Sequence, residues 1–332
     1  MRVLFLGGTG NISTACVERA LEEGHEVTLL TRGQRPSGFA ASVQAVVGDR
    51  EDVALLRTTA STTRPDAVVD FLAFRPDQVQ AAITAFAGAV GHYVFISSAS
   101  VYERPVRNHV ITEATPRANP FWEYARQKIA CEERLLRAHR EEGFPATIVR
   151  PSYTYGPTWV PSGLGGQDYT VVDRIRRGAP IVCHGDGTSL WVMTASSDFA
   201  VGLAGLLGRA EARGEAFHIT SDEVLTWDAI YRTIGRAAGR EPEIVHVPSD
   251  LVLALYPERG PSLLGDKAWS VVFDNAKIKR FVPAFRARTT FAEGMARSVA
   301  WYDADPARRV VSEKANQMLD RVVAAQRRAY RE

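Results

Sequence analysis

Three residues of the chain carry groups that exchange protons and could act together. Tyr124 and Lys128 stand in the segment EYARQKIACEE, four positions apart, so a helix would place both on one face. Ser98 stands in FISSASVY, directly after a strand-like run. A phenol, an ammonium group and a hydroxyl suit acid–base chemistry on an alcohol or a carbonyl. Tyr124 and Lys128 alone would also fit an ordinary amphipathic helix, and Ser98 is what favours the chemical interpretation.

A glycine-rich turn near the N-terminus indicates a site for an anion. In VLFLGGTGNIS, Gly7 and Gly10 stand between a first strand and a first helix. Gly7 permits the tight turn, and Gly10 lets a pyrophosphate approach the unpaired N–H groups at the helix N-terminus. Ser13 occupies the place of the usual third glycine, and it is small enough for close packing of helix and strand. The position after a strand and before a helix predicts dinucleotide binding.

The residues after the second and third strands bear on which dinucleotide is bound. An NAD-selective site would place Asp or Glu after the second strand, where this chain has Thr31 and Arg32. A guanidinium suits a 2′-phosphate, so the sequence slightly favours NADP over NAD. Asp49 follows the third strand and could accept a hydrogen bond from the adenine amino group.

The first half of the chain alternates strand-like and helix-like segments, which predicts an α/β fold with a Rossmann-like, doubly wound parallel sheet. Helical periodicity marks segments such as 13–23 and 76–89. The expected strands are Val3–Leu6, Glu26–Leu30, Val43–Val47, Ala67–Phe71, Tyr93–Ile96, Ala146–Val149 and Ala216–Thr220.

The amino-acid composition changes after Arg150 and Pro151, which predicts a smaller C-terminal substrate-binding lobe. Residues 155–169 are dense in Gly, Pro and aromatics, as in a long functional loop. A helix is expected in TWDAIYRTIGRAAG, capped by Thr226 and ended by Gly239, and the basic segment 306–332 is expected to form a solvated surface helix. We assign residues 1–155 and 192–220 to the dinucleotide-binding domain and residues 156–191 and 221–332 to the substrate lobe.

Composition excludes several classes of protein. The chain has 332 residues, 45% of them hydrophobic, and a formal charge of +2, so it can bury a core and carries no field that would recruit nucleic acid or a membrane. Its three cysteines lack paired spacing, and its histidines lack metal-like spacing, so we expect no disulfide framework and no metal. No run of residues is long and apolar enough to span a bilayer. These features predict a soluble, cytoplasmic protein.

Taken in order, these motifs resemble those of the extended short-chain dehydrogenase/reductase (SDR) family, in its NAD-dependent epimerase/dehydratase branch for nucleotide sugars. The resemblance covers nearly the whole chain and rests on the glycine turn, Asp49, Ser98, the Tyr124–Lys128 pair, RPSYTYGP at 150–157 and GDGT at 185–188. It implies that Tyr124 is the general acid/base, that Lys128 lowers its pKa and binds the nicotinamide ribose, and that Ser98 donates a hydrogen bond to the reacting oxygen.

The resemblance also implies which residues bind cofactor and substrate. Ser100, Tyr102, Arg174 and Trp191 are candidates for the substrate, with Trp191 equally suited to the core. Arg174 and the neighbouring Arg176 and Arg177 could meet a diphosphate, although for at least two of the three a solvated charge on a helix is the favoured interpretation. The candidate cofactor residues are Gly7, Thr9, Gly10, Asn11, Ile12, Arg32, Asp49, Arg50, Leu72, Ala73, Tyr124, Lys128, Pro151 and Tyr153.

One departure from the family narrows the reaction. Dehydratases place an Asp-Glu pair after the catalytic Ser or Thr, where this chain has Ala99 and Ser100, so elimination of that type is not expected. Epimerisation through a keto-sugar needs only Ser98, Tyr124 and Lys128. The resemblance therefore favours an NAD(P)-dependent nucleotide-sugar epimerase, with an NADPH-dependent keto-sugar reductase as the alternative. NAD would suit the redox-neutral epimerase and NADP the reductase.

A binding protein is the third possibility. The segments FISSA and TSDE also resemble those of plant plastid stem-loop RNA-binding proteins of the same fold, which as a group lack a reliably intact Tyr-x-x-x-Lys pair. This chain has the pair and a nearly balanced charge, so we expect an enzyme with no nucleic-acid partner. The family further implies a homodimer that packs through two helices, one of them carrying Tyr124.

Overall fold

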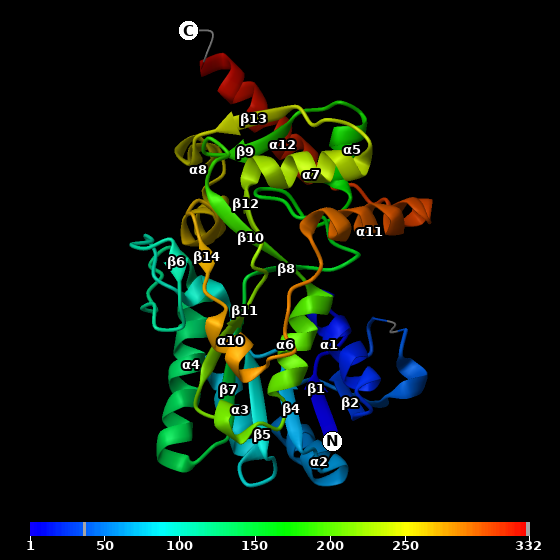
Figure 1. Ribbon diagram of the computed structural model, residues 1–332, viewed down its shortest axis with the longest axis vertical. Coiled ribbons are helices and arrows are strands. Elements are labelled where there is room, and N and C mark those ends of the chain that lie inside the picture. The colour runs from blue at the N-terminus through cyan, green and yellow to red at the C-terminus, as the bar shows by residue number, and fades with distance from the viewer. Residues whose placement is uncertain (36–37, 330–332) are drawn as a thin grey trace.

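Seven parallel strands form the central sheet, in the order β11-β7-β5-β4-β1-β2-β3. The computed structural model describes residues 1–35 and 38–329 (Figure 1). All seven expected strands are confirmed, with ends that differ by at most two residues. They are β1 Arg2–Leu6, β2 Glu26–Thr31, β3 Gln44–Val47, β4 Ala67–Asp70, β5 His92–Ile96, β7 Ala146–Pro151 and β11 Ala216–Ile219.

Helices cover both faces of this sheet, as the alternating pattern predicts. Phe5 and Val69 contribute to the core beneath α1 and α6, and Leu4 and Val68 to the core beneath the helices of the other face. Neighbouring residues of β1 and β4 thus point to opposite faces, which explains why these strands read as continuous apolar runs. The helices are α1 Asn11–Glu22, α6 Ser196–Leu206 and α10 Ala276–Phe281 on one face, and α2 Val53–Thr63, α3 Pro76–Phe86 and α4 Glu123–Glu142 on the other.

A smaller lobe stands over the carboxyl ends of the strands (Figure 1). Its helix α7, Trp227–Ala238, is capped by Thr226 and ended by Gly239 in a left-handed conformation, as expected. The lobe has its own apolar core, which includes Trp191 and Trp227. Its other elements are β8 Tyr153–Tyr155, β9 Ile181–His184, β10 Leu190–Ala195, β12 Val224–Thr226, β13 Ile244–Val247, α5 Thr170–Arg176, α8 Ser249–Leu255, α11 Phe291–Asp303 and α12 Glu313–Ala329.

Two expectations about the second half are wrong in detail. Helix α10 belongs to the segment assigned to the substrate lobe, yet it packs against β11 and α6 of the large lobe. Conversely, β8 and most of β10 belong to segments assigned to the dinucleotide-binding domain, yet they contribute Tyr155, Val192 and Met193 to the core of the small lobe. Helix α12 is not simply a solvated surface helix, because Met318, Leu319 and Val322 are buried in a cluster with residues of β9, β13 and α8. Residues 330–332, which the sequence prediction included in this helix, lie outside the described part of the chain. The short strands β6, Val110–Ile111, and β14, Val272–Phe273, pair beside the junction of the lobes.

Candidate active site

The turn between β1 and α1 is built from backbone in conformations that favour glycine. Gly7 and Gly8 have φ angles of +96° and +136°, and a Cβ on Gly8 would lie 2.9 Å from Leu29 Cδ2. Ser13, in the place of the third glycine, is buried and accepts a hydrogen bond of 2.9 Å from Gly10 N. The serine therefore fits the packing and also satisfies one N–H group of the turn.

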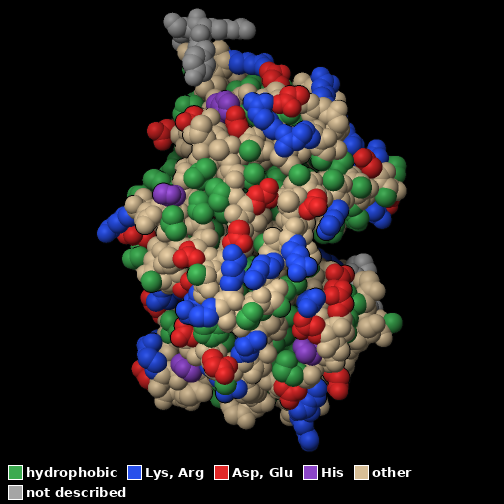
Figure 2. All heavy atoms as spheres, viewed as in Figure 1, with side chains coloured by type: hydrophobic (Ala, Val, Ile, Leu, Met, Phe, Trp, Pro, Cys, Tyr) green, Lys and Arg blue, Asp and Glu red, His purple; other side chains and the backbone are tan. Residues whose placement is uncertain are grey.

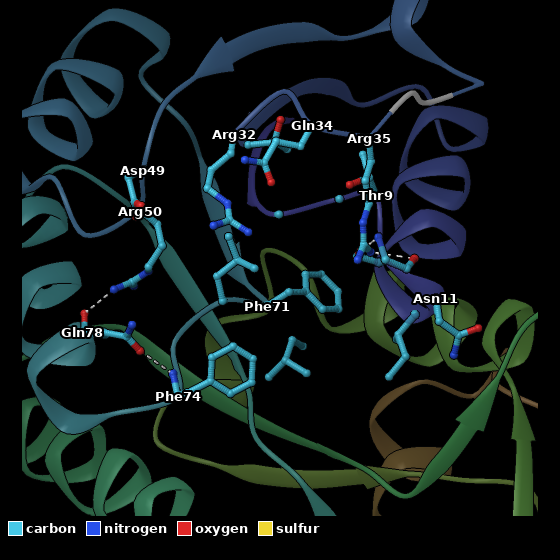
Figure 3. Close-up of a pocket in the computed structure, with 18 of the residues that line it drawn as sticks. Thr9, Asn11, Arg32, Gln34, Arg35, Asp49, Arg50, Phe71, Phe74 and Gln78 are labelled. Carbon is cyan, nitrogen blue, oxygen red and sulfur yellow. Dashed lines mark hydrogen bonds between the residues drawn. The ribbon is translucent and has the colours of Figure 1, made fainter. Parts of the chain in front are cut away.

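A cavity of about 820 Å³ opens above this turn, at the carboxyl ends of β1, β2 and β4 (Figure 3). Parallel α/β sheets bind ligands at the carboxyl ends of their strands, at the point where the strand order reverses. Of the candidate cofactor residues, the cavity is lined by Gly7, Thr9, Gly10, Asn11, Ile12, Arg32, Asp49, Arg50, Leu72, Tyr124, Lys128 and Pro151.

Two candidate cofactor residues do not line this cavity. Ala73 is fully buried behind it, and its carbonyl oxygen accepts a hydrogen bond of 2.7 Å from Lys128 Nζ. Tyr153 lies in a second cavity, described below. A direct contact between either side chain and a ligand in the large cavity does not fit the structure, because one is covered and the other faces elsewhere.

Three arginines, Arg32, Arg35 and Arg50, line the large cavity. Arg32 points into the cavity in Figure 3, and Gln34 and Arg35 line the same end. Arg50 differs from Arg32, because its guanidinium is buried, donates to Asp70 Oδ2 at 2.6 Å and donates to the Gln78 carbonyl at 3.0 Å. Arg50 is thus tied to the protein, whereas Arg32 is free to meet an anion: among the described residues it has no carboxylate partner within salt-bridge distance.

Tyr124 and Lys128 line the other end of the large cavity, and Ser98 lies beside Tyr124 in the wall of an adjoining cavity, so the sequence correctly places the three residues near one another. Lys128 is 1% exposed, and its ammonium donates to the carbonyl oxygens of Ala73 and Ile96 at 2.7 and 2.8 Å. Burial lowers the pKa of Lys128 to about 8. Burial raises the pKa of Tyr124 to about 12, and a hydrogen bond with Ser98 opposes that shift. Ser98, more than Lys128, is what lowers the pKa of the phenol in this arrangement.

A buried ion-pair network fixes the strand end that carries Ser98. Ser97 Oγ donates to Glu132 Oε1 at 2.6 Å, and Arg150 makes a bidentate pair with the same carboxylate at 2.9 and 2.6 Å. Arg117 adds a second cation, 3.0 Å from Glu132 Oε2. Glu132 is on α4, two turns after Tyr124, so the network joins the strand end before Ser98 to the helix that carries the other two residues.

A second cavity, of about 250 Å³, adjoins the first at Ile12, Tyr124, Pro151 and Trp159, which line both. Ser98 and the predicted substrate residue Ser100 line it, with their hydroxyl oxygens 2.9 Å apart. Several other residues that line it were not predicted from the sequence. They include Trp122, Trp159, Gln167, Asp266 and Lys267.

Some signal existed for part of this set. Trp122 is two residues before Tyr124, and Trp159 and Gln167 belong to the loop 155–169 that was identified as functional. Asp266 and Lys267 come from a segment about 140 residues after Tyr124 with no recognisable motif, so only the folded chain reveals them.

Three predicted substrate residues lie outside both cavities. Tyr102 is fully buried, and its hydroxyl bonds to His218 Nδ1 at 3.0 Å. Trp191 belongs to the core of the small lobe, where it packs 5.8 Å from Trp227 between ring centroids. Arg174 is 0% exposed and donates to Pro180 O, to Asn316 Oδ1 and to Asp320 Oδ1, the last at 2.6 Å. These contacts anchor α12, so Arg174 cannot reach a substrate diphosphate.

The two neighbouring arginines are also engaged elsewhere. Arg176 pairs with Asp303 at 2.6 Å, and Arg177 with Asp173 at 2.9 Å. One group of possible metal ligands exists within the described residues, formed by Cys183, Asp228 and His246 with ligand atoms within 4.8 Å of one another. None of the three lines either cavity. His246 Nε2 and Asp228 Oδ1 are hydrogen-bonded at 2.7 Å, so these two side chains are satisfied within the protein.

These features fit a nicotinamide dinucleotide. The glycine turn offers a backbone cradle for a pyrophosphate at the N-terminus of a twelve-residue helix. The cavity extends from Arg32 at one end to Tyr124 and Lys128 at the other. Comparison with known proteins decides the matter, because the model of the NAD dependent epimerase/dehydratase family matches residues 3–220.

The chain belongs to this family. Membership confirms the resemblance drawn from the motifs, and it makes the chain an enzyme that uses a nicotinamide dinucleotide. The chain is 30% identical to 2'-dehydrokanamycin reductase of Streptomyces kanamyceticus over 288 residues, which are 87% of this chain and 81% of the relative. It is 26% identical to the chloroplast stem-loop binding protein of 41 kDa b of Arabidopsis thaliana over 264 residues, 74% of this chain and 65% of that protein.

Solved structures confirm the fold. The UDP-glucose 4-epimerase of Thermotoga maritima, solved with UDP-glucose, matches with a TM-score of 0.74 and 18% identity, over 92% of this chain and 99% of that one. The dTDP-glucose 4,6-dehydratase of Bacillus anthracis, solved with NAD, matches with a TM-score of 0.75 and 18% identity, over 92% of this chain and 98% of that one.

None of the helices in the described part of the chain is long and apolar enough to cross a membrane.

Proposed function

We propose that the protein interconverts an alcohol and a ketone on a sugar ring, and that its net reaction is the NADPH-dependent reduction of a keto-sugar. The observation that carries the proposal is the meeting of the two cavities at Tyr124, with Ser98 beside it. A substrate in the small cavity would there face a cofactor in the large one.

Ser98, Tyr124 and Lys128 have distinct roles in this reaction. The nicotinamide, when bound, supplies or accepts the hydride that interconverts ketone and alcohol. Tyr124 gives its phenolic proton to the carbonyl oxygen during reduction, and Ser98 donates a hydrogen bond to the same oxygen. Lys128 uses two of its three N–H donors on Ala73 O and Ile96 O, which leaves one for the ribose beside the nicotinamide.

The far end of the large cavity supports NADP as the cofactor. Arg32 and Arg35 line it where NAD-selective sites carry a carboxylate. A guanidinium can form paired hydrogen bonds with a 2′-phosphate. NADPH serves net reductions, and the relative from Streptomyces kanamyceticus carries a reductase name.

A redox-neutral nucleotide-sugar epimerase is the second candidate. It needs the same three residues and is the activity in the name of a relative, the UDP-glucose 4-epimerase of Lactobacillus helveticus. The ion pairs of Arg174, Arg176 and Arg177 count against it, because the arginines expected to meet a nucleotide diphosphate are held by Asp320, Asp303 and Asp173. These ion pairs therefore favour the reductase over the epimerase.

We further propose that the enzyme is a cytoplasmic homodimer that binds small molecules and neither nucleic acid nor membrane. All three cysteines are buried free thiols, as expected in a reducing compartment. On the face shown in Figure 2, basic and acidic side chains are interspersed, without the single basic stripe of a nucleic-acid interface. Light scattering of the purified protein would measure the oligomeric state.

Cofactor release and turnover test the proposal. The purified protein is denatured, any released dinucleotide is identified, and NADPH oxidation is followed with a panel of keto-sugars. We expect no tightly held NAD and measurable NADPH oxidation. Stoichiometric NAD in the denatured protein, with no net oxidation of NADPH by any ketone, would establish the epimerase instead.

A further inference from the structure

A π-helical turn, Leu263–Lys267, forms one wall of the small cavity. Such turns are rare in proteins, and those that occur often lie at functional sites. Asn119 Nδ2 donates to Gly265 O at 2.7 Å and to Ser100 O at 2.8 Å, and His184 Nε2 bonds to Lys267 O at 2.8 Å. The turn is thus held against the loop that carries Ser98 and Ser100.

Asp266 presents from this turn the one carboxylate among the described residues that line the small cavity. Its side chain is 19% exposed, and Arg104 Nη2 lies 3.6 Å from its Oδ1. That separation exceeds a hydrogen bond, and Arg104 donates its Nη1 to the carbonyl oxygens of Tyr102 and Glu103. Burial raises the pKa of Asp266, and the opposing effects of Lys267 and Arg104 do not cancel that shift.

The other walls suit a cationic sugar better than a phosphorylated one. No arginine is among the described residues that line the small cavity. Trp122, Tyr153 and Trp159 supply aromatic surfaces, which attract cations and cover the apolar faces of sugar rings. Lys267 is the remaining charged wall, and its ammonium lies 5.9 Å from the centre of the Tyr153 ring.

We propose that Asp266 determines specificity by accepting a hydrogen bond from a protonated amine of the substrate, so that the small cavity selects an amino-sugar. The inference deepens the proposed function and rests on it for the identity of the small cavity as the sugar site. At about 250 Å³ the cavity is smaller than most ligand pockets, which matches a single amino-substituted ring. A charge-assisted hydrogen bond of this kind is worth enough to discriminate between an amine and a hydroxyl.

Ligand-detected NMR titration of the protein in the presence of NADP⁺ tests the inference without any turnover. The probes are glucosamine, glucose and N-acetylglucosamine, which differ in whether the substituent on carbon 2 is charged. We expect glucosamine to bind the wild-type protein at least about fivefold more tightly than either neutral sugar. In Asp266→Asn that preference should fall below about twofold.

Glu258→Gln is the matched control, since it removes an exposed carboxylate eight residues earlier and should keep the preference. NADP⁺ affinity of each variant shows that it has folded. Equal binding of the three sugars to the wild type, or a preference that survives in Asp266→Asn, would overturn the inference. If no keto-sugar supports NADPH oxidation and the preference is still lost only in Asp266→Asn, the proposed function fails while the ammonium site stands.

Discussion

The two cavities of the protein are built in different ways. The large one is lined mostly by residues that directly follow strands, such as the Gly7–Gly10 turn after β1 and Arg32 after β2. The small one is made of side chains brought together from five separate segments, from Ile12 to Lys267. The first therefore follows from local sequence, whereas the second depends on how the lobes are joined.

Tyr124 lies where the two cavities meet. It lies on α4, whose position is fixed by the Glu132 network, and it lines both cavities. Substitutions on either side of Tyr124 should therefore affect different quantities: cofactor affinity on one side, substrate selection on the other, and turnover only at the junction.

Removal of the Tyr124 hydroxyl should have the largest effect. Tyr124→Phe deletes the proton donor, and general acid–base catalysis contributes about 10²- to 10⁴-fold, so we expect kcat to fall by about 10³-fold. The Kd for NADPH should change by less than about twofold, because phenylalanine keeps the aromatic wall. Steady-state kinetics and fluorescence titration measure both quantities. Residual activity within tenfold of wild type would move the proton donor to another residue.

Arg32→Ala tests the far end of the large cavity. Loss of a charge-assisted hydrogen bond costs about 1.5–3 kcal/mol, so the KM for NADPH should rise by about 10- to 100-fold. The KM for NADH should stay within about twofold, because NADH has no 2′-phosphate. Kinetics with both cofactors give the ratio. Equal losses with the two cofactors would show that Arg32 does not read the phosphate.

Lys128 offers a test of stability against pH. Its pKa is about 8 in the folded protein, below the ordinary value of 10.5, so the unfolded chain binds more protons between these values. The free energy of unfolding should therefore rise with pH in this window, by about 2 kcal/mol between pH ~7.5 and ~9.5, relative to Lys128→Met. Urea denaturation of both proteins without cofactor measures the difference. Parallel curves would show that Lys128 is not buried as the structure has it.

The smallest effect is expected outside both cavities. Arg177 was a candidate for a substrate diphosphate, but its guanidinium pairs with Asp173 and lines neither cavity. Surface ion pairs contribute little, so Arg177→Ala should change kcat/KM by less than about twofold and stability by less than about 1 kcal/mol. A tenfold rise in the substrate KM would restore the diphosphate hypothesis and, with it, the epimerase.

The same difference between the two cavities explains which features can be predicted from the sequence. The strands, the glycine turn and the set of Ser98, Tyr124 and Lys128 were predictable because each lies at the end of an element that its own neighbours in sequence specify. Polarity alone misled elsewhere. Arg174 has the chemistry of an anion-binding residue, but its partners Asn316 and Asp320 are more than 140 residues away, so only the packing of α12 shows that it is buried.

Asp266 shows the converse. Nothing in LLGDK marks a binding residue, because the π-helical turn that presents it depends on Asn119 and His184 from distant segments. Tyr102 and Trp191 could not be assigned in advance for a similar reason, since aromatic residues serve cores and pockets equally well. Contacts between the lobes therefore carry the information about substrate that the motifs lack.

Transfer of deuterium from cofactor to product tests the central claim most directly. The wild-type protein and Tyr124→Phe are incubated with NADPH deuterated at carbon 4 of the nicotinamide and with a keto-sugar, and the product is analysed by mass spectrometry. Wild-type protein should yield an alcohol with one deuterium on the former carbonyl carbon, with one NADPH oxidised for each product, and Tyr124→Phe should yield almost none. An epimerised sugar without deuterium and with no NADPH consumed would contradict the account.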